Sequence, residues 1–352
     1  MLLEGLYIPL TTPFHPDGRL NLHKLASNID RYSKTPAAGL IVLSPCGEPT
    51  LLSDDETRET LRTAAQSAPP EKVLVAGISR DSVRATLALA DFASKQKYDA
   101  ALIGIPSVLT EEANSRQLLT YFQIIADRSP IPIILLCANG RTIPIEAIVE
   151  VAAHPQIIGL LNSDPKQSES SIADILARTA TVHRGVTVTP TFAAVTSRMA
   201  IAATAASNGP VALISVGSLT GAATAVAEPL TISPPLRTRT KTVGFQIIAA
   251  HTPQILVGLR AGVSAIAPAF AACAPQACFE VFAAWKDGDQ PLAEEKQFRL
   301  LQAAALAEVA PASLKFACDL NGYFGGLPRL PHLPLKGAQR AALELPMKPV
   351  RN

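Results

Sequence analysis

Eight short runs of apolar residues recur along the chain, and a longer segment with a helical pattern follows each of them. The runs are LYIPLTT (6–12), GLIVLSP (39–45), VLVAGIS (73–79), AALIGIP (100–106), IPIILLCA (131–138), IIGLLNS (157–163), GFQIIAA (244–250) and SAIAPAF (264–270). Runs without polar alternation are typical of strands that are covered on both faces. Strict alternation of strand and helix predicts a parallel sheet, and eight such units predict a closed (β/α)8 TIM barrel.

One interval in this series is much longer than the others and lies between the sixth and seventh runs. It predicts an insertion at about 180–241, with strand-like pieces VTVTP (186–190) and VALISVG (211–217). A rival interpretation takes these two pieces as barrel strands seven and eight. We favour the later runs, because FEVFAAWKDGD and EEKQFRLLQAAALAEVA after them supply a final helix and an extension. The expected organisation is a barrel over 1–290 and a C-terminal helical extension over 291–352.

Two of the intervening helices carry recognisable start signals. Ser53 and Glu56 in SDDETRETLRTAA form a capping-box pattern, in which each side chain accepts a hydrogen bond from a free backbone N–H of the first turn. Thr110 precedes another helical segment, EEANSRQLLTYFQIIADR, as a second expected cap. Both helices are expected on the outside of the barrel.

Composition and charge exclude several classes of protein. The chain has 352 residues, of which 48% are hydrophobic and 17% are charged, so it can bury a large core. The net charge of +2 comes without a basic cluster, so we expect no nucleic-acid partner. The uncharged stretch between Arg198 and Glu228 is rich in small residues and broken by Asn208 and Pro210, so we expect no membrane span.

The N-terminal sequence and the cysteines indicate the cellular compartment. The opening MLLEGLYIPLTTPF lacks a basic leader and does not resemble a secretory signal, so we expect a cytoplasmic protein. The cysteines are odd in number and match no zinc spacing, which predicts buried, reduced thiols. They are Cys46, Cys137, Cys273, Cys278 and Cys318.

Several motifs follow the predicted strands, where the chemistry of such barrels is placed. They are TPF…DG after the first run, GE…LS..E after the second, GRT after the fifth, and LKFACDLNGYFGG…RLPHLPL in the tail. In this order the chain resembles the dihydrodipicolinate synthase and N-acetylneuraminate lyase family of Schiff-base aldolases, over most of its length outside the insertion. The resemblance implies a lyase that acts on a small carboxylate without a cofactor. It also leads us to expect a homo-oligomer, a dimer or a tetramer.

The residues that carry the family's chemistry are replaced. The family forms an imine between a 2-oxo acid and a lysine that ends strand six, and only an amine can do this. Leu161 occupies that position, and Leu136 occupies the position of the proton-shuttling tyrosine. The second, intersubunit tyrosine matches Ser107, and the hydroxyl pair before Gly-Glu matches Pro45 and Cys46. Lysine-imine chemistry is therefore not expected.

Two other lysines lie near these motifs but are not expected to replace the missing amine. Lys166 lies in a loop beyond strand six, and Lys315 lies in the tail. Neither is expected to reach the barrel axis.

Part of the family's binding apparatus is retained. The resemblance assigns Arg141 to the substrate carboxylate, for which a guanidinium offers two parallel hydrogen bonds. The alternative is a solvated loop arginine paired with an acid. Gly47 and Glu48 belong to a loop that lies against the substrate in the family, although an acid there more often supports the loop itself.

The remaining candidates at the strand ends have weaker signals. Cys46 and Cys137 are expected to point into the cavity, as nucleophiles or as small buried residues. Asn162 either hydrogen-bonds a substrate oxygen or satisfies the strand end. His251, Asp164 and Glu48 are weak candidates for a divalent metal that would replace the iminium, although no two of them share a short motif.

Two functions remain open from the sequence. The first is a lyase-like or aldolase-like enzyme that acts on a small 2-oxo or hydroxy acid by a route without a lysine imine. The second is a catalytically inactive family member that works as a carboxylate-binding module or as a partner subunit. The insertion, which carries few charges, is expected either to roof the pocket or to extend a subunit interface.

Overall fold

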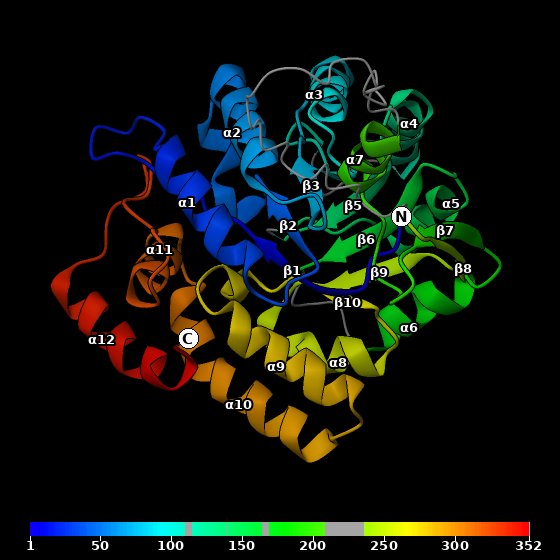
Figure 1. The fold of residues 1–352 in the computed structure, drawn as a ribbon. Helices are drawn as coiled ribbons and strands as arrows, with labels where there is room; N and C mark the ends of the chain where they lie inside the picture. The colour runs from blue at the N-terminus through cyan, green and yellow to red at the C-terminus, as the bar shows by residue number, and fades with distance from the viewer. Residues whose placement is uncertain (110–114, 139, 164–168, 208–235, 352) are drawn as a thin grey trace, which may run out of the picture.

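The barrel predicted from the eight apolar runs is present in the computed structural model, which describes residues 1–109, 115–138, 140–163, 169–207 and 236–351 (Figure 1). Eight parallel strands close in the order β1-β10-β9-β6-β5-β4-β3-β2. They are β1 (Gly5–Pro9), β2 (Gly39–Val42), β3 (Val73–Gly77), β4 (Ala100–Gly104), β5 (Ile133–Cys137), β6 (Ile157–Asn162), β9 (Gln246–Ala249) and β10 (Ala265–Ile266). The (β/α)8 TIM-barrel prediction is confirmed.

The choice between the two interpretations of the insertion is settled by strand pairing. β9 and β10 close the barrel, as expected for the later pair of runs. The segment around 186–190 instead contributes to β7 (Arg184–Val188), which pairs antiparallel with β8 (Arg239–Val243) in a separate two-stranded sheet. The rival assignment of VTVTP to the barrel is therefore wrong, and 211–217 lies outside the described residues.

The eighth strand is shorter than its apolar run predicts. Only Ala265 and Ile266 are in strand conformation, and a short 3₁₀ turn, η4 (Ala269–Ala272), follows directly. The backbone N–H of Ala267 still bonds to the carbonyl of Ala249, but Pro268 has no N–H to continue the ladder. Proline thus ends the strand inside the run.

Helices alternate with the strands and surround the barrel (Figure 1). They are α1 (Leu22–Ser33), α2 (Asp54–Ser67), α3 (Val83–Lys95), α4 (Ser115–Arg128), α5 (Ile145–Ala152), α6 (Glu169–Arg178), α8 (Ile255–Arg260) and α9 (Pro275–Lys286). The capping box before α2 is confirmed, because the Ser53 hydroxyl accepts from the Glu56 N–H and the Glu56 carboxylate accepts from the Ser53 N–H. The expected cap at Thr110 lies outside the described residues.

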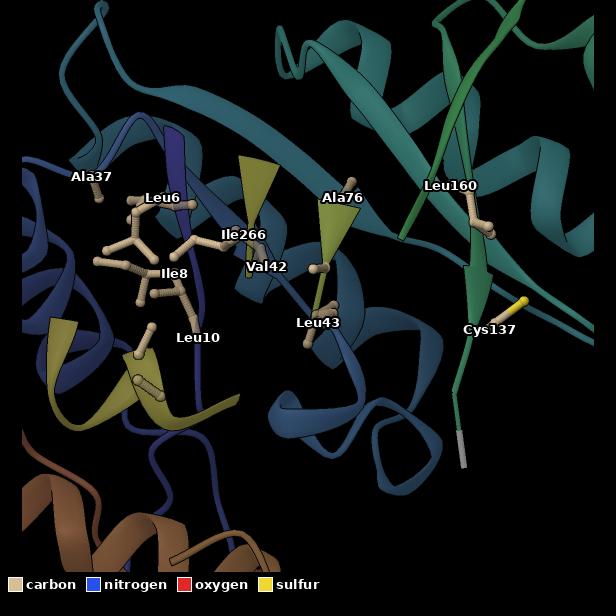
Figure 2. Packing of buried hydrophobic residues seen from close by; sticks show 14 of the residues in the cluster. Leu6, Ile8, Leu10, Ala37, Val42, Leu43, Ala76, Cys137, Leu160 and Ile266 are labelled. Carbon is tan, nitrogen blue, oxygen red and sulfur yellow. The ribbon is translucent and has the colours of Figure 1, made fainter. Parts of the chain in front are cut away.

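Two apolar layers hold the barrel together. One lies between the strands and the surrounding helices, and Figure 2 shows part of it, including Leu6, Ile8, Val42 and Leu160. The other fills the barrel itself. Because successive side chains of a strand point to opposite faces, neighbours such as Leu160 and Leu161 belong to different layers.

The C-terminal segment adds three helices after the barrel: α10 (Gln290–Ala307), α11 (Pro311–Leu320) and α12 (Gly337–Met347). α10 packs along α9, and α12 contacts both α10 and α11. This agrees with the helical extension that the sequence predicts. The division of the chain near residue 291 remains a prediction.

The described part of the insertion covers the end of the barrel at which the strands begin. The Asp99 carboxylate, just before β4, accepts a hydrogen bond from the Ser197 N–H at the start of α7 (Ser197–Ser207). Thr196 donates to the carbonyl of Pro70, and Leu2 packs against Val186 of β7. These described residues therefore do not roof the opposite end of the barrel, which was one of the two expectations.

In the part of the chain that the structure describes, no helix has the length and apolar character needed to cross a membrane.

Candidate functional site at the barrel mouth

Leu136 and Leu161 lie at the C-terminal ends of β5 and β6, at the positions that the resemblance assigns to the family's tyrosine and lysine. The two residues are register partners. Leu161 belongs to the cluster that fills the barrel, and Leu136 packs against that cluster. The phenol of Tyr7 in this cluster lies at the other end, near Asp99 and Glu4. Leu136 and Leu161 therefore add aliphatic surface to the floor of the mouth.

The loop after β2 is held in a strained backbone conformation. Leu43 and Glu48 both have positive φ, at 60° and 54°, which a residue with a Cβ adopts at a cost. Gly77 of β3 makes room for this loop, because a Cβ there would lie 2.0 Å from the Leu43 carbonyl oxygen. The carbonyl of Gly47 accepts a 2.6 Å hydrogen bond from the Thr12 hydroxyl after β1. These contacts fix the loop that the resemblance places against substrate.

Glu48 forms a buried ion pair with the tail of the chain. Its Oε1 lies 2.5 Å from the ammonium of Lys315 in α11, and the two side chains are 2% and 0% exposed. Its Oε2 accepts from the backbone N–H of Arg329 at 3.0 Å. Glu48 therefore supports the loop and the tail, which is the structural alternative that the sequence left open.

Lys315 is buried but does not enter the barrel. Its ammonium donates to the carbonyl of Leu327 at 3.0 Å and lies 4.3 Å from the centre of the Phe14 ring. Phe14 belongs to the layer between strands and helices. Burial lowers the pKa of Lys315, and the nearby Glu48 carboxylate opposes that shift. Lys315 is thus a tail residue held between loops, while Lys166 lies outside the described residues.

Two residues of the tail, Arg329 and Tyr323, contact the helices that follow the first two barrel strands. The Arg329 guanidinium binds both carboxylate oxygens of Glu56 and lies 4.8 Å from the Phe14 ring centre. Tyr323 is buried and stacks on Tyr32, with 4.3 Å between ring centroids. Both residues fasten the tail to this barrel.

Arg141 is engaged with the loop between β4 and α4. Its Nη1 donates to the carbonyls of Ile105 and Pro106 at 3.0 and 2.8 Å, and its Nη2 donates to those of Ser107 and Leu109 at 3.0 and 2.8 Å. All four acceptors are backbone carbonyls, and the guanidinium is only partly buried. In this geometry the guanidinium group that was expected to bind a substrate carboxylate instead binds backbone carbonyls of a loop.

Both candidate thiols lie against the layer between the strands and the helices. Cys137 faces the layer between strands and helices rather than the cavity, which corrects the expectation that it points inward (Figure 2). Its sulfur accepts from the N–H of Ile143 at 3.3 Å. Cys46 packs against the same layer, and burial, reinforced by the charge of Glu308, raises its pKa to about 12. All five cysteines are free, as expected.

The proposed metal ligands do not converge among the described residues. Those residues contain no group of three His, Cys, Asp or Glu side chains placed to hold a metal ion. Glu48 is paired with Lys315, His251 follows β9, and Asp164 lies outside the described residues. Asn162 is buried at the end of β6 and pairs in register with Cys137, so the alternation of the strand directs it away from the barrel axis.

Glu308 is a site residue that the sequence reasoning missed. It caps the end of α10, and its Oε1 accepts from the Thr252 hydroxyl at 2.5 Å and from the Phe270 N–H at 2.7 Å. These two donors lie in the short 3₁₀ turns that follow β9 and β10, so one carboxylate links the segments after the last two barrel strands. Burial raises the pKa of Glu308. A lone acid within the apolar run AAALAEVAPA was the available signal.

The closed barrel of eight parallel strands alternating with helices defines a (β/α)8 TIM-barrel protein. The model of the dihydrodipicolinate synthetase family matches residues 2–218, and the chain belongs to this family.

Individual relatives agree with this assignment. A 4-hydroxy-tetrahydrodipicolinate synthase of Exiguobacterium sp. is 24% identical over 97% of this chain and 96% of its own length. An L-threo-3-deoxy-hexylosonate aldolase of Hypocrea jecorina is 29% identical over 44% of this chain and 52% of its own. The crystal structure of a dihydrodipicolinate synthase of Bacillus anthracis superposes with a TM-score of 0.77 at 16% identity, covering all of both chains.

Proposed function

We propose that this chain is a family member without lysine-imine activity that works as a non-catalytic subunit of a family assembly. The lost chemistry follows from Leu136 and Leu161, because neither side chain can condense with a carbonyl or carry a proton. The proposal keeps the lyase family as the origin of the fold and assigns this chain a structural role within it.

The observation that carries the proposal is the use made of Arg141. Four hydrogen bonds from its guanidinium hold the backbone from Ile105 to Leu109. This loop contains Ser107, at the position of the family's intersubunit tyrosine, and Val108, which is 67% exposed. The Ser107 hydroxyl and N–H each lie 2.5 Å from the Asp81 carboxylate, which fixes the loop from a second side. A segment from Ile105 to Leu109 that is held by these hydrogen bonds and carries an exposed apolar residue suits a subunit contact better than capture of a small acid.

Oligomeric state tests the structural half of the proposal. In sedimentation and light-scattering measurements, Val108→Asp should dissociate the assembly, and Arg141→Ala should weaken it by loosening the loop. Val309→Asp is the matched control, because Val309 is 74% exposed in a different region. A wild-type chain that is monomeric, or an assembly that Val108→Asp leaves intact, contradicts the proposal.

Covalent trapping tests the chemical half. Incubation with pyruvate and borohydride should leave the mass of the protein unchanged, because an imine must form before it can be reduced. An adduct on any lysine would show that the family mechanism survives through another amine. Lys315 would be the first residue to map by peptide mass spectrometry.

A second candidate is an enzyme that acts on a small oxo or hydroxy acid by a route without an imine. Glu308 favours it, because a carboxyl group with a raised pKa at the strand ends suits general acid–base work. Turnover of 2-oxo or hydroxy acids that is lost in Glu308→Gln and follows a single ionisation would support it. Binding of such acids that is lost in Arg141→Ala without turnover would instead indicate a binding module.

A further inference from the structure

A cavity lies at the end of the barrel opposite the mouth, between the barrel and the insertion. Its volume is about 910 Å³, at the upper end of the range usual for small-molecule sites. It is lined by the N-terminal segment, the loops before β2 and β3, the loop at 191–194 and the end of α9. The loop at 191–194 belongs to the insertion, so one wall of the cavity is formed by a segment that a regular (β/α)8 barrel lacks.

The cavity combines an apolar surface with lysines. Phe192, Phe279 and Phe282 line it together with several alanines, and Lys72, Lys241 and Lys286 contribute ammonium groups. Flat aromatic surface and a few placed charges are the usual composition of a site for a small organic ligand.

The charges of the lining define what kind of anion would fit. Glu4 bridges two of the lysines, with Oε1 at 2.7 Å from Lys286 and Oε2 at 3.1 Å from Lys241. Two ammonium groups on one carboxylate leave an excess positive charge there. Glu71 and Asp287 also line the cavity, so its three acids balance its three lysines. The local excess of positive charge beside Glu4 can pair with one anionic group, whereas the lining as a whole offers no further positive charge to a polyanion.

Lys72 adds a further hydrogen-bond donor to the lining of the cavity. Its ammonium donates to the carbonyls of Thr35 and Ala37 at 2.9 and 2.7 Å. An ammonium has three N–H donors, so these two bonds leave capacity for one more. The two carbonyls hold its position, so a ligand carboxylate would meet a charge that is already placed.

Phe192 projects from a strained loop at the edge of this cavity. Its φ is +63°, and its side chain is 50% exposed although it is large and apolar. The loop is closed by hydrogen bonds from the Phe192 N–H to the Thr189 carbonyl and from the Thr189 N–H to the Ala193 carbonyl. A bulky residue in the left-handed region is costly, and strained positions of this kind are enriched at functional sites.

We propose that this cavity binds a small organic acid with one negative charge and a flat apolar body. The anion would lie against Lys72 and the Glu4-bridged pair Lys241 and Lys286, and the body would lie between Phe192 and the aromatic residues of α9. The proposal does not depend on the role assigned to the barrel mouth, because no residue is shared between the two sites.

The test uses 2-naphthoate as the probe, titrated by calorimetry against the full chain. Saturable binding at a single site is expected. The neutral 2-naphthylmethanol should bind about tenfold more weakly, because it lacks the charge-assisted hydrogen bonds. A naphthalene carrying several carboxylates should also bind more weakly, because the lining has no net positive charge for it.

Two variants locate the binding. Phe192→Gly removes the aromatic wall but suits the positive φ, so it should weaken binding about fivefold without lowering the melting temperature. Lys286→Gln should weaken binding of naphthoate but not of the neutral alcohol. Phe298→Ala is the matched control, because Phe298 is 68% exposed on α10, outside the cavity lining. Absence of saturable binding, or equal effects of Phe192→Gly and Phe298→Ala, would overturn the proposal.

Discussion

The buried pair Glu48–Lys315 allows a quantitative test of how the tail is held on the barrel. Both side chains are almost fully buried and 2.5 Å apart. Removing one partner of such a pair strands the other charge in the interior and costs about 3–5 kcal/mol. Glu48→Gln leaves the Lys315 ammonium with the Leu327 carbonyl and the Phe14 ring, and Lys315→Met leaves the Glu48 carboxylate with one backbone N–H.

The expected shift in melting temperature follows from the size of the chain. With about 2.1 cal/mol/K of unfolding entropy per residue, 352 residues give roughly 0.7 kcal/mol per degree near the midpoint. Each single variant should therefore lower Tm by about 4–7 °C. The double variant should lose clearly less than the sum of the two, because it leaves no unpaired charge.

Differential scanning calorimetry of the four proteins in this cycle measures the coupling. Lys34→Met is the control, because the Lys34–Asp30 pair is exposed and should contribute less than about 1 kcal/mol. Additive losses in the double variant, or single losses no larger than that of Lys34→Met, would refute the assignment of Glu48 as a tail anchor.

Three further predictions concern the mouth. Gly77→Ala should lower stability by about 1–3 kcal/mol in urea denaturation, because its Cβ would lie 2.0 Å from the Leu43 carbonyl oxygen; a neutral result would contradict the close approach. The pKa of Glu308 is raised in the folded protein, so above pH 4.5 the folded state binds more protons than the unfolded chain. The stability that this carboxyl group contributes is therefore fully present below pH 4.5. It is lost as the pH rises through the pKa of the folded state. The Tm of Glu308→Gln relative to wild type should therefore improve between pH 4.5 and neutrality, and a pH-independent difference would argue against the shift. With a pKa of about 12, Cys46 should resist iodoacetamide at neutral pH until the protein unfolds, and rapid labelling of the native protein, mapped by mass spectrometry, would count against that environment.

The barrel architecture could be predicted because strands buried on both faces have continuous apolar sequences. The continuous apolar runs fixed the number and order of the barrel strands, and the lengths of the intervals located the insertion. The exact ends were less predictable. β10 ends at Ile266, shortly before Pro268, although its apolar run continues to Phe270.

The positions of the site residues could be predicted from the sequence, but their hydrogen-bond and ion-pair partners could not. Leu136 and Leu161 could be placed at the mouth because strand ends and motif order locate them. The roles of Arg141 and Glu48 depend on backbone carbonyls of another loop and on Lys315, 267 positions away along the chain. Such partners cannot be identified from a sequence motif. The resemblance of the GRT motif to the family therefore predicted an arginine at position 141 but not its hydrogen-bond partners.

The inward-facing Leu161 also bears on how this scaffold could be re-engineered. An amine placed there by Leu161→Lys would be surrounded by aliphatic side chains, and desolvation would hold much of it uncharged and nucleophilic at neutral pH. The apolar interior alone would thus lower the pKa of the introduced lysine, without a neighbouring acid or base. Converting this barrel into a carbonyl-trapping reagent is therefore a matter of one substitution for the capture step, whereas proton delivery and acid recognition would have to be built separately.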